Sequence, residues 1–480
     1  MSEVRGFWLA GTLATGEQVR EIRHPYDNRL IATVSVPTAH QVEEAVAAAA
    51  QVAATAAALP AHVRAQALDH ISRRIAERAE EFARLITAEN GKPIKWARLE
   101  VSRAITTFRW AAEEARRFSG DLQRLDTDPA SAGRLAVIRR FPRGPVLAIT
   151  PFNFPLNLVA HKVAPAIAVG APVIVKPAPK TPLSALALGE LLAETELPAG
   201  MWSVLPLDNE ETAALVTDPR LPVVSFTGSS RVGWQIRRAV PEKHVTLELG
   251  GNAAAVVCPD WSSPADLDYA AARIATFATY QAGQSCISVQ RVIADTSVAE
   301  PLTERIVAAV RAQRTGDPWD DATDVGPLID EAAAIRVQSW IDEALARGAR
   351  ALTGGERDGA SVAPTVLSDV PSDARVSCEE VFGPVLVVES VDGVDAAFRR
   401  VNESRYGLQA GVFTHDIHIA FRAHRELEVG GVIIGDVPSY RADQMPYGGV
   451  KESGVGREGV RYAMEDYTYE RVLVLTGLPL

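Results

Sequence analysis

The sequence predicts an α/β protein built from two α/β units, on three observations. Short apolar runs alternate with helical patterns at residues 146–249, as is typical of a parallel sheet that helices cover on both faces. A second alternation of this kind follows from residue 253 to about residue 441. The 480 residues also exceed the size, roughly 250 to 300 residues, at which a single hydrophobic core stops growing.

The region before the first sheet is predicted to be helical. Between residues 41 and 120, apolar side chains recur at helical spacing in a sequence rich in Ala, Glu and Arg. Gly-Lys-Pro at 91–93 interrupts this region, because Gly followed by Pro ends one helix and can open the next. Residues 135–141 are predicted to form a strand, and their polar neighbours favour an exposed or edge position.

The first sheet is predicted to have strands at 146–150, 172–175, 223–226 and 245–249, with helices at 183–192 and 231–239. The second unit is predicted to have strands at 253–257, 289–293 and 385–388, with helices near 267–278 and 300–314. A helix at 459–465 precedes a last strand at 467–475. Because ligands of such sheets collect at the carboxyl ends of the strands, the residues after each strand are candidates for a binding site.

The charge balance argues against polyanionic partners. The 49 Lys and Arg against 60 Asp and Glu give a formal net charge of −11, which disfavours binding to nucleic acid or to an anionic membrane. The first residues lack a basic segment leading into an apolar run, and no window reaches the roughly 18 apolar residues of a membrane helix. We therefore expect a cytoplasmic protein whose partners are small molecules or copies of itself.

The three cysteines differ in their surroundings. They are far apart and form no C-x-x-C pair, so neither a disulfide framework nor a metal site is indicated. Cys258 ends an apolar run and is predicted to be a buried hydrophobic residue, while Cys378 lies in a polar stretch. Cys286 follows Gly-Gln-Ser in what reads as a loop, which makes it the candidate reactive thiol.

Two strands of the first sheet are followed by polar side chains. Asn153 lies in the stiff turn PFNFP; the alternative is an Asn that bonds its own backbone, as is common in such turns. Lys176 and Lys180 follow the next strand and could meet the ribose or phosphate of a nucleotide. The alternative of a solvated loop lysine is favoured for Lys180 more than for Lys176.

The next two strands lead to an anion-binding candidate and a candidate base. TGSS at 227–230 opens a helix whose free N–H groups favour an anion, although it departs from G-x-G-x-x-G and Ser is also an ordinary N-cap. Glu248 lies in an apolar run, where burial would raise its pKa and suit a general base near neutral pH. The alternative is an ion-paired structural glutamate.

Seven motifs, in order over nearly the whole chain, resemble the aldehyde dehydrogenase superfamily: PFNFP, VKPAPKTP, FTGSSRVG, LELGGN, GQSC, EEVFGPV and MPYGGVKESGVGREG. The resemblance implies a Rossmann-like NAD(P)-binding domain of residues 1–119 and 143–251 and a catalytic α/β domain of residues 252–449. It further implies a small β oligomerisation element with a tail, residues 120–142 and 450–480.

The resemblance also implies a chemistry, the NAD(P)-dependent, non-acylating oxidation of an aldehyde to a carboxylic acid. Cys286 matches the nucleophile that forms a thiohemiacetal and then a thioester. Asn153 and the backbone N–H of Cys286 match the donors to the oxyanion, and Glu248 matches the base that activates water. The residues expected to bind the cofactor are Thr150, Pro151, Phe152, Lys176, Pro179, Lys180, Gly228, Ser229, Val232, Leu249, Gly250, Glu380 and Phe382.

Three of these cofactor positions have a more specific interpretation. Glu380 and Phe382 match residues that hold the nicotinamide ribose and ring, although Glu380 could also be a plain surface acid. Pro179 stands where NAD-preferring relatives often carry a glutamate that bonds the adenosine ribose. Without that acid, Lys176 or Lys180 could pair with a 2′-phosphate, so we expect dual use of NAD(P)+ with a slight lean to NADP.

Substrate residues are suggested by position alone. Arg109, His161, Arg291 and Arg441 lie on segments that approach the substrate funnel in similar enzymes, and Ser285 and Ile287 flank the thiol. If two of the four basic residues converge, the aldehyde carries a carboxylate, phosphate or phosphonate. Ordinary surface arginines are the alternative.

The strands at 135–141 and 467–475 match the protruding oligomerisation element of the family. Unpaired strand edges pair readily with a neighbouring chain, so we expect a homodimer or a homotetramer.

Three other activities remain open at this point. In a coenzyme A-acylating relative, thiolysis would replace hydrolysis, but Glu248 as the base for water argues against it. A catalytically silent structural member of the family is disfavoured by the joint presence of Cys286, Glu248 and Asn153. A thiol hydrolase acting on activated esters would use the same three residues without a cofactor.

Overall fold

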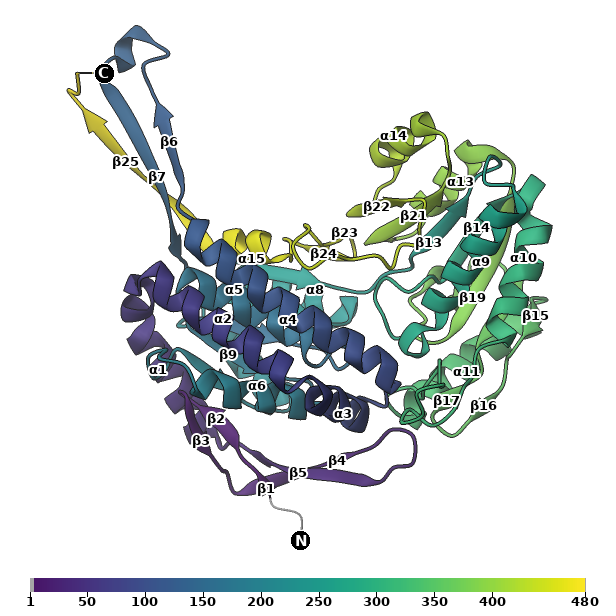
Figure 1. The fold of residues 1–480 in the computed structure, drawn as a ribbon, viewed down its shortest axis with the longest axis horizontal. Coiled ribbons are helices and arrows are strands. Elements are labelled where there is room, and N and C mark those ends of the chain that lie inside the picture. Colours follow the sequence, from purple (N-terminus) through teal and green to yellow (C-terminus); the bar gives the residue numbers. More distant parts are fainter. Residues whose placement is uncertain (1–3, 480) are drawn as a thin grey trace.

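The computed structural model describes residues 4–479, and it contains two sheet-based units and a β ribbon that projects from one of them (Figure 1). The first sheet has eight strands in the order β24-β12-β11-β8-β9-β10-β2-β3. The strands are β2 Phe7–Leu9, β3 Thr12–Ala14, β8 Val146–Ile149, β9 Val173–Lys176, β10 Trp202–Val204, β11 Val223–Thr227, β12 His244–Glu248 and β24 Gly454–Val455. Strands β12, β11, β8, β9 and β10 run parallel, as the alternating pattern predicts.

Eight helices pack around this sheet: α1 Ala39–Ala58, α2 Ala61–Glu77, α3 Ala79–Asn90, α4 Ile94–Arg117, α5 Asn157–Val169, α6 Leu183–Ala193, α7 Asn209–Thr217 and α8 Ser230–Ala239. One continuous cluster of buried apolar side chains joins them to the strands. The break predicted at residues 91–93 separates α3 from α4. Gly91 ends α3 in the left-handed region, with φ of 73°, and Pro93 precedes the first residue of α4.

The second sheet has seven strands in the order β15-β18-β19-β14-β13-β21-β22. They are β13 Ala254–Val257, β14 Arg291–Asp295, β15 Arg350–Thr353, β18 Thr365–Ser368, β19 Val385–Val391, β21 Gln409–Phe413 and β22 Gly431–Ile434. All neighbours pair in parallel except β15 and β18. Its helices are α9 Pro264–Thr279, α10 Thr296–Arg311, α11 Glu331–Ala346, α12 Arg375–Cys378, α13 Gly393–Asn402 and α14 Ile417–Glu426.

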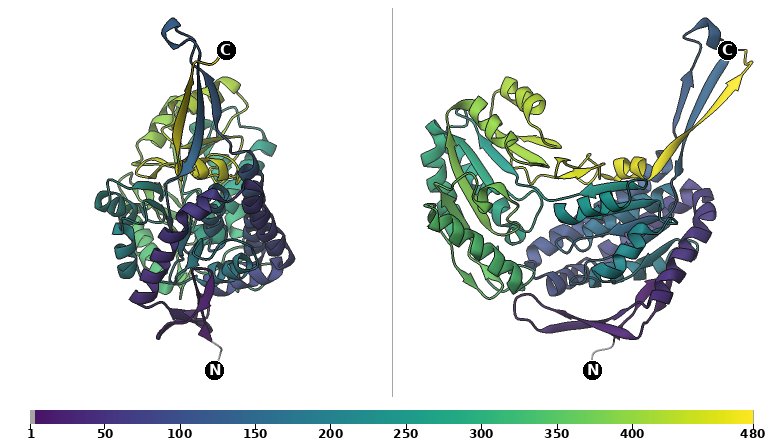
Figure 2. Two further views of the ribbon diagram at one scale, coloured as in Figure 1. Left: turned by 90° about the vertical axis from the view of Figure 1, so that its left-hand side faces the viewer. Right: turned by 180° about the vertical axis from the view of Figure 1, so that it is seen from behind.

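The projecting ribbon shows that the predicted edge position of the strand at 135–141 is wrong. It consists of β6 Asp121–Arg124, β7 Arg134–Pro142 and β25 Thr468–Thr476, and Figure 2 shows it extending away from both units. The strand predicted at 135–141 is mostly half-buried, with Arg139 exposed. β7 is the central strand, because β25 pairs with one side of it and β6 with the other.

The remaining strands form smaller sheets. A third sheet consists of β1 Val4–Arg5, β5 Leu30–Val36 and β4 Gln18–Arg23. Two short pairs are formed by β16 Arg357–Asp358 with β17 Ser361–Val362, and by β20 Tyr406–Gly407 with β23 Val450–Lys451. Helix α15 Val460–Asp466 leads into β25, close to the predicted bounds. β24 of the C-terminal tail joins the first sheet by pairing with β12. Within residues 4–479, no single helix is both long and apolar enough to cross a membrane; α1 and α2 meet the two conditions only together, as a pair bent by 112°.

Candidate active site

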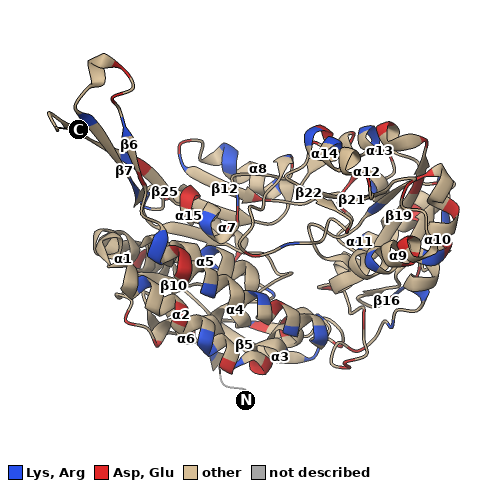
Figure 3. Cartoon of the chain, turned by 45° about the horizontal axis from the view of Figure 1, so that its top comes forward, with Lys and Arg blue, Asp and Glu red and all other residues tan. Residues whose placement is uncertain are grey.

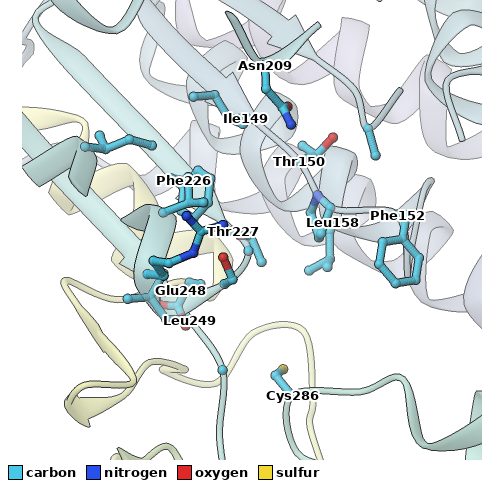
Figure 4. Close-up of a pocket in the computed structure, with 18 of the residues that line it drawn as sticks. Ile149, Thr150, Phe152, Leu158, Asn209, Phe226, Thr227, Glu248, Leu249 and Cys286 are labelled. Carbon is cyan, nitrogen blue, oxygen red and sulfur yellow. The ribbon is translucent and has the colours of Figure 1, made fainter. Parts of the chain in front are cut away.

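A cavity of about 830 Å³ opens where four parallel strands of the first sheet end. Thr150 follows β8, Lys176 ends β9, Thr227 ends β11 and Glu248 ends β12, and all four line the cavity. Residues of the second unit close the other side, among them Cys286 (Figure 4). The site therefore lies at the carboxyl ends of the strands, where α/β sheets bind their ligands.

A strained loop positions Cys286. Gln281 and Ala282 have positive φ values of 52° and 53°, and Gly283 follows with 70°. A Cβ on Gly283 would lie 2.0 Å from the carbonyl oxygen of Gly383, so only glycine fits there. The half-buried Cys286 sulfur lies 2.9 Å from the Tyr447 hydroxyl oxygen. Burial raises the pKa of the thiol to about 11, and the contact with Tyr447 opposes this rise.

Glu248 is a buried carboxyl group with free oxygens. It is 3% exposed, and neither carboxylate oxygen has a hydrogen-bond partner among the described residues. Burial first, and then the negative charge of Glu458, raise the pKa of Glu248 well above its usual value. Because a buried polar group without a partner is costly, these oxygens are placed to bond a guest in the cavity, such as a water molecule.

Asn153 joins the first unit to the segment that carries the thiol. It is buried, and its Nδ2 donates a hydrogen bond to the carbonyl oxygen of Gln284 at 3.0 Å. The side chain of Gln281 in turn donates to the main-chain oxygen of Asn153. An amide nitrogen carries two N–H groups, so one remains for an oxygen of a bound substrate. Asn153 and Cys286 both line the cavity.

A buried charge network, which the sequence did not predict, lies beside Glu248. Lys162 Nζ donates to Glu458 Oε1 at 2.9 Å and to Ser225 Oγ at 3.0 Å, and Arg441 donates to Glu458 Oε2 at 3.1 Å. Although burial opposes its ionisation, Lys162 and Arg441 hold the pKa of Glu458 at about 2. The available signal was a lysine, next to His161, in a helix whose other residues are mostly apolar.

The predicted cofactor residues line the cavity with one exception. Lining positions are Thr150, Pro151, Phe152, Lys176, Pro179, Gly228, Ser229, Val232, Leu249, Gly250, Glu380 and Phe382. Lys180 does not line it, because its ammonium group pairs with the carboxylate of Asp330 near the surface. Lys176 is largely buried and donates to Asn209 Oδ1 at 3.0 Å, and burial lowers its pKa to about 8.

These residues fit a dinucleotide. The Thr150 and Ser230 hydroxyl oxygens are buried and have no hydrogen-bond partner within residues 4–479. Helix α8 begins at the cavity, where the free N–H groups of its first turn can meet an anion. Glu380 Oε1 accepts a hydrogen bond from the Gly251 N–H at 3.1 Å, and burial raises the pKa of Glu380 to about 7. Gly250 allows this close approach, since a Cβ there would lie 2.1 Å from the other carboxylate oxygen.

Of the four basic substrate candidates, one lines the cavity, so the condition that two of them converge is not met there. Arg441 lines it. Arg109 is exposed on α4, and His161 is buried with its Nε2 3.0 Å from Asp443 Oδ1. Arg291 is 2% exposed, and its guanidinium group donates to the carbonyl oxygens of Arg400 and Asn252.

The residues on either side of the thiol are both buried. Ser285 is 9% and Ile287 is 6% exposed. Ile287 packs against Leu408 and Tyr447 in a small apolar cluster that also contacts Cys286.

Comparison with known proteins gives consistent matches along the chain. The model of the aldehyde dehydrogenase family matches residues 12–473. The chain is 42% identical to 3-sulfolactaldehyde dehydrogenase of Priestia aryabhattai over 98% of both chains. Aldehyde dehydrogenase 21 of Physcomitrella patens, solved with the reaction product succinate, is 42% identical, with a TM-score of 0.97 over 100% of this chain and 99% of that one. Glyceraldehyde-3-phosphate dehydrogenase of Methanocaldococcus jannaschii, complexed with NADP, is 35% identical, with a TM-score of 0.91 over 96% and 100%.

Proposed function

The chain belongs to the aldehyde dehydrogenase family, and we propose that it oxidises a small anionic aldehyde to a carboxylic acid through a thioester on Cys286. As a member of this family it is an oxidoreductase that uses a nicotinamide cofactor. The observation that carries the proposal is that Cys286, Glu248 and Asn153 line one cavity together with the dinucleotide-fitting residues.

The proposed reaction assigns one step to each of the three residues. The sulfur of Cys286 adds to the aldehyde carbon, and the free N–H of Asn153 with the backbone N–H of Cys286 holds the resulting oxyanion. A nicotinamide cofactor held by the dinucleotide-fitting residues of the cavity would supply the acceptor for the hydride lost from this tetrahedral carbon. Glu248 then takes a proton from water, which attacks the thioester and releases the acid. A base facing a water-accessible cavity favours hydrolysis over transfer to coenzyme A.

Arg441 is the basis for the proposed anionic substrate. Its guanidinium group is buried at the cavity, and its Nε has no partner among the described residues. Free donors in a planar fork suit a carboxylate or a sulfonate. The names of three similar proteins mention an acidic substrate or product: 3-sulfolactaldehyde, succinate and glyceraldehyde 3-phosphate.

A matched pair of four-carbon aldehydes, with and without a terminal carboxylate, tests this substrate class. A charge-assisted hydrogen bond contributes about 1.5–3 kcal/mol, so we expect roughly ten- to hundredfold higher kcat/KM for the anionic aldehyde. Arg441→Met should remove most of this preference. Arg109→Met, an exposed arginine outside the cavity, is the control and should retain it. Equal efficiency with both aldehydes in the unaltered enzyme would rule out the anionic class.

We also propose dual cofactor use with a lean to NADP. Pro179 lines the cavity and carries no charge that would repel a 2′-phosphate, and Lys176 is the lysine available to pair with it. Comparing kcat/KM for NADP and NAD tests the lean, and a hundredfold preference for NAD would refute it. Pro179→Glu should shift the ratio toward NAD, whereas Lys180→Ala should leave the ratio unchanged because Lys180 pairs with Asp330.

A further inference from the structure

The hydroxyl of Tyr447 contacts the reacting sulfur directly. The two atoms lie 2.9 Å apart, although the residues are 161 positions apart in the chain. Tyr447 is 3% exposed, and within residues 4–479 the sulfur is the only hydrogen-bond partner of its hydroxyl group. A buried hydroxyl group needs a partner, so this contact satisfies both the phenol and the thiol.

Arg441 lies over the ring of the same tyrosine. The central carbon of its guanidinium group is 3.8 Å from the ring centroid, and Glu458 holds the group in place at 3.1 Å. A cation over an aromatic face draws electron density toward itself, which makes the phenolic O–H a stronger donor. The Tyr447 hydroxyl is therefore polarised toward the sulfur.

We propose that the Tyr447 hydroxyl donates a hydrogen bond to the ionised sulfur of Cys286 and thereby stabilises the thiolate form of the nucleophile. This proposal rests on the proposed function, in which Cys286 attacks the aldehyde. The thiol proton leaves to a base, and Tyr447 keeps its own proton. It remains a donor because burial, and then the charge of Cys286, raise the pKa of the phenol well above its usual value.

The other charged groups that face the sulfur make this donor necessary. Glu248 and Glu380 oppose ionisation of Cys286, and among these neighbours only Arg441 favours it through its charge. The nearby amide of Asn153 donates to a main-chain carbonyl oxygen. Loss of the Tyr447 hydroxyl would therefore leave a buried thiolate beside two carboxyl groups without its neutral donor.

The alternative is that Tyr447 only shapes the cavity through its contacts with Ile287 and Leu408. Phenylalanine would preserve those contacts and the position of the ring under Arg441. Tyr447→Phe therefore removes the hydrogen bond alone. The matched control is Tyr280→Phe, which deletes the hydroxyl of another buried tyrosine, one that does not line the cavity.

The experiment measures the rate of alkylation by iodoacetamide against pH, resolved by mass spectrometry to the peptide that carries Cys286. In Tyr447→Phe, the midpoint for Cys286 should rise by about one pH unit, as expected for loss of a charge-assisted hydrogen bond. Tyr280→Phe should leave it unchanged, and the exposed Cys378 serves as an internal reference in every sample. An unchanged Cys286 midpoint in folded Tyr447→Phe would overturn the proposal.

Activity should change in a related way. A rise of one unit in the Cys286 midpoint reduces the thiolate fraction near pH 7 about tenfold, while the more basic sulfur is about threefold more nucleophilic. The value of kcat/KM near pH 7 should therefore fall roughly threefold and recover at higher pH.

If Tyr447→Phe does not fold, 3,5-difluorotyrosine at position 447 keeps the hydrogen bond with a more acidic donor. It should lower the Cys286 midpoint, and no shift would contradict the proposal. Alkylation needs neither aldehyde nor cofactor, so it separates this proposal from failure of the proposed function.

Discussion

Two buried glutamates at the cavity have opposite environments. Glu458 is paired with Lys162 and Arg441, whereas the oxygens of Glu248 have no partner among the described residues. The pKa of Glu458 is therefore held at about 2, while the pKa of Glu248 is raised. When their environments shift the pKa values of two titratable groups in opposite directions, the carboxyl group with the raised pKa is suited to proton transfer near neutral pH.

This contrast predicts an acid limb in the pH profile of turnover. Glu248 acts as a base only when ionised, and its pKa lies above the value of roughly 4.3 for a free glutamate. Turnover at saturating aldehyde should therefore fall as the pH drops through that raised pKa. Glu248→Gln should lose turnover and show no such limb. If the acid limb of the unaltered enzyme has its midpoint at the pKa of a free carboxyl group, the proposed role of Glu248 is contradicted.

The Lys162–Glu458 pair predicts a stability effect. Lys162→Met leaves Glu458 less compensated, and breaking a buried pair from one side costs about 3–5 kcal/mol, measurable by urea unfolding at pH 7. The depressed pKa means that Glu458 contributes stability above the pKa of an unfolded glutamate, and this contribution is lost as the pH falls toward about 2. The double variant Lys162→Met/Glu458→Gln should recover part of the loss. A single variant that costs under about 1 kcal/mol would show that the pair contributes little.

The thiol loop that follows α9 depends on its backbone geometry. Gly283 combines a positive φ with close contact to Gly383, and the loop carries Cys286 three residues later. Gly283→Ala should destabilise the protein by about 1–3 kcal/mol and reduce activity, because the backbone must shift. Gly359→Ala is the matched control, with a positive φ of 53° but no atom within 4 Å of the added Cβ. Equal melting temperatures and activities in the two variants would contradict this reading.

Local patterns predicted most elements, and non-local contacts account for what was missed. Strands β8, β9 and β12 were predictable because a buried parallel strand is a short apolar run bounded by turn residues. β7 was placed at an edge because its partner β25 lies more than 300 residues further along the chain.

The residues of the candidate site also fall into those that local motifs predict and those whose roles depend on long-range contacts. Cys286, Glu248 and Asn153 lie in distinctive motifs, so the sequence predicted them. Tyr447 and Lys162 gain their roles from contacts across 161 and 296 residues, which no local pattern contains. The sequence left the role of Arg291 open, because neighbouring residues do not show whether a guanidinium group bonds main-chain carbonyl oxygens, as it does here, or a bound anion.

At the scale of the molecule, the two units share one cavity and the ribbon stands apart from it. Figure 3 shows charges of both signs interspersed along the outer helices. The ribbon instead exposes a run of apolar side chains on β25: Val472, Leu473, Val474 and Leu475. Exposed apolar strands of this kind bury their surface against another chain, so we propose a homodimer or a homotetramer.

A charged residue on β25 tests the proposed assembly. Leu473→Glu should lower the mass measured by light scattering, because it places a charge in the proposed interface. Leu13→Glu changes a similarly exposed residue on β3 and should leave the mass unchanged. A mass equal to one chain in the unaltered protein at all concentrations would rule out the assembly.

The most direct test of the central claim is to capture the acyl group on Cys286. Glu248→Gln is mixed with aldehyde and cofactor, quenched in acid, and analysed by mass spectrometry of the peptide that carries Cys286. The account predicts one acyl group per chain on this cysteine, formed together with one equivalent of reduced nicotinamide. Reduced nicotinamide without an acyl group on Cys286, in a quench that preserves thioesters, would contradict it.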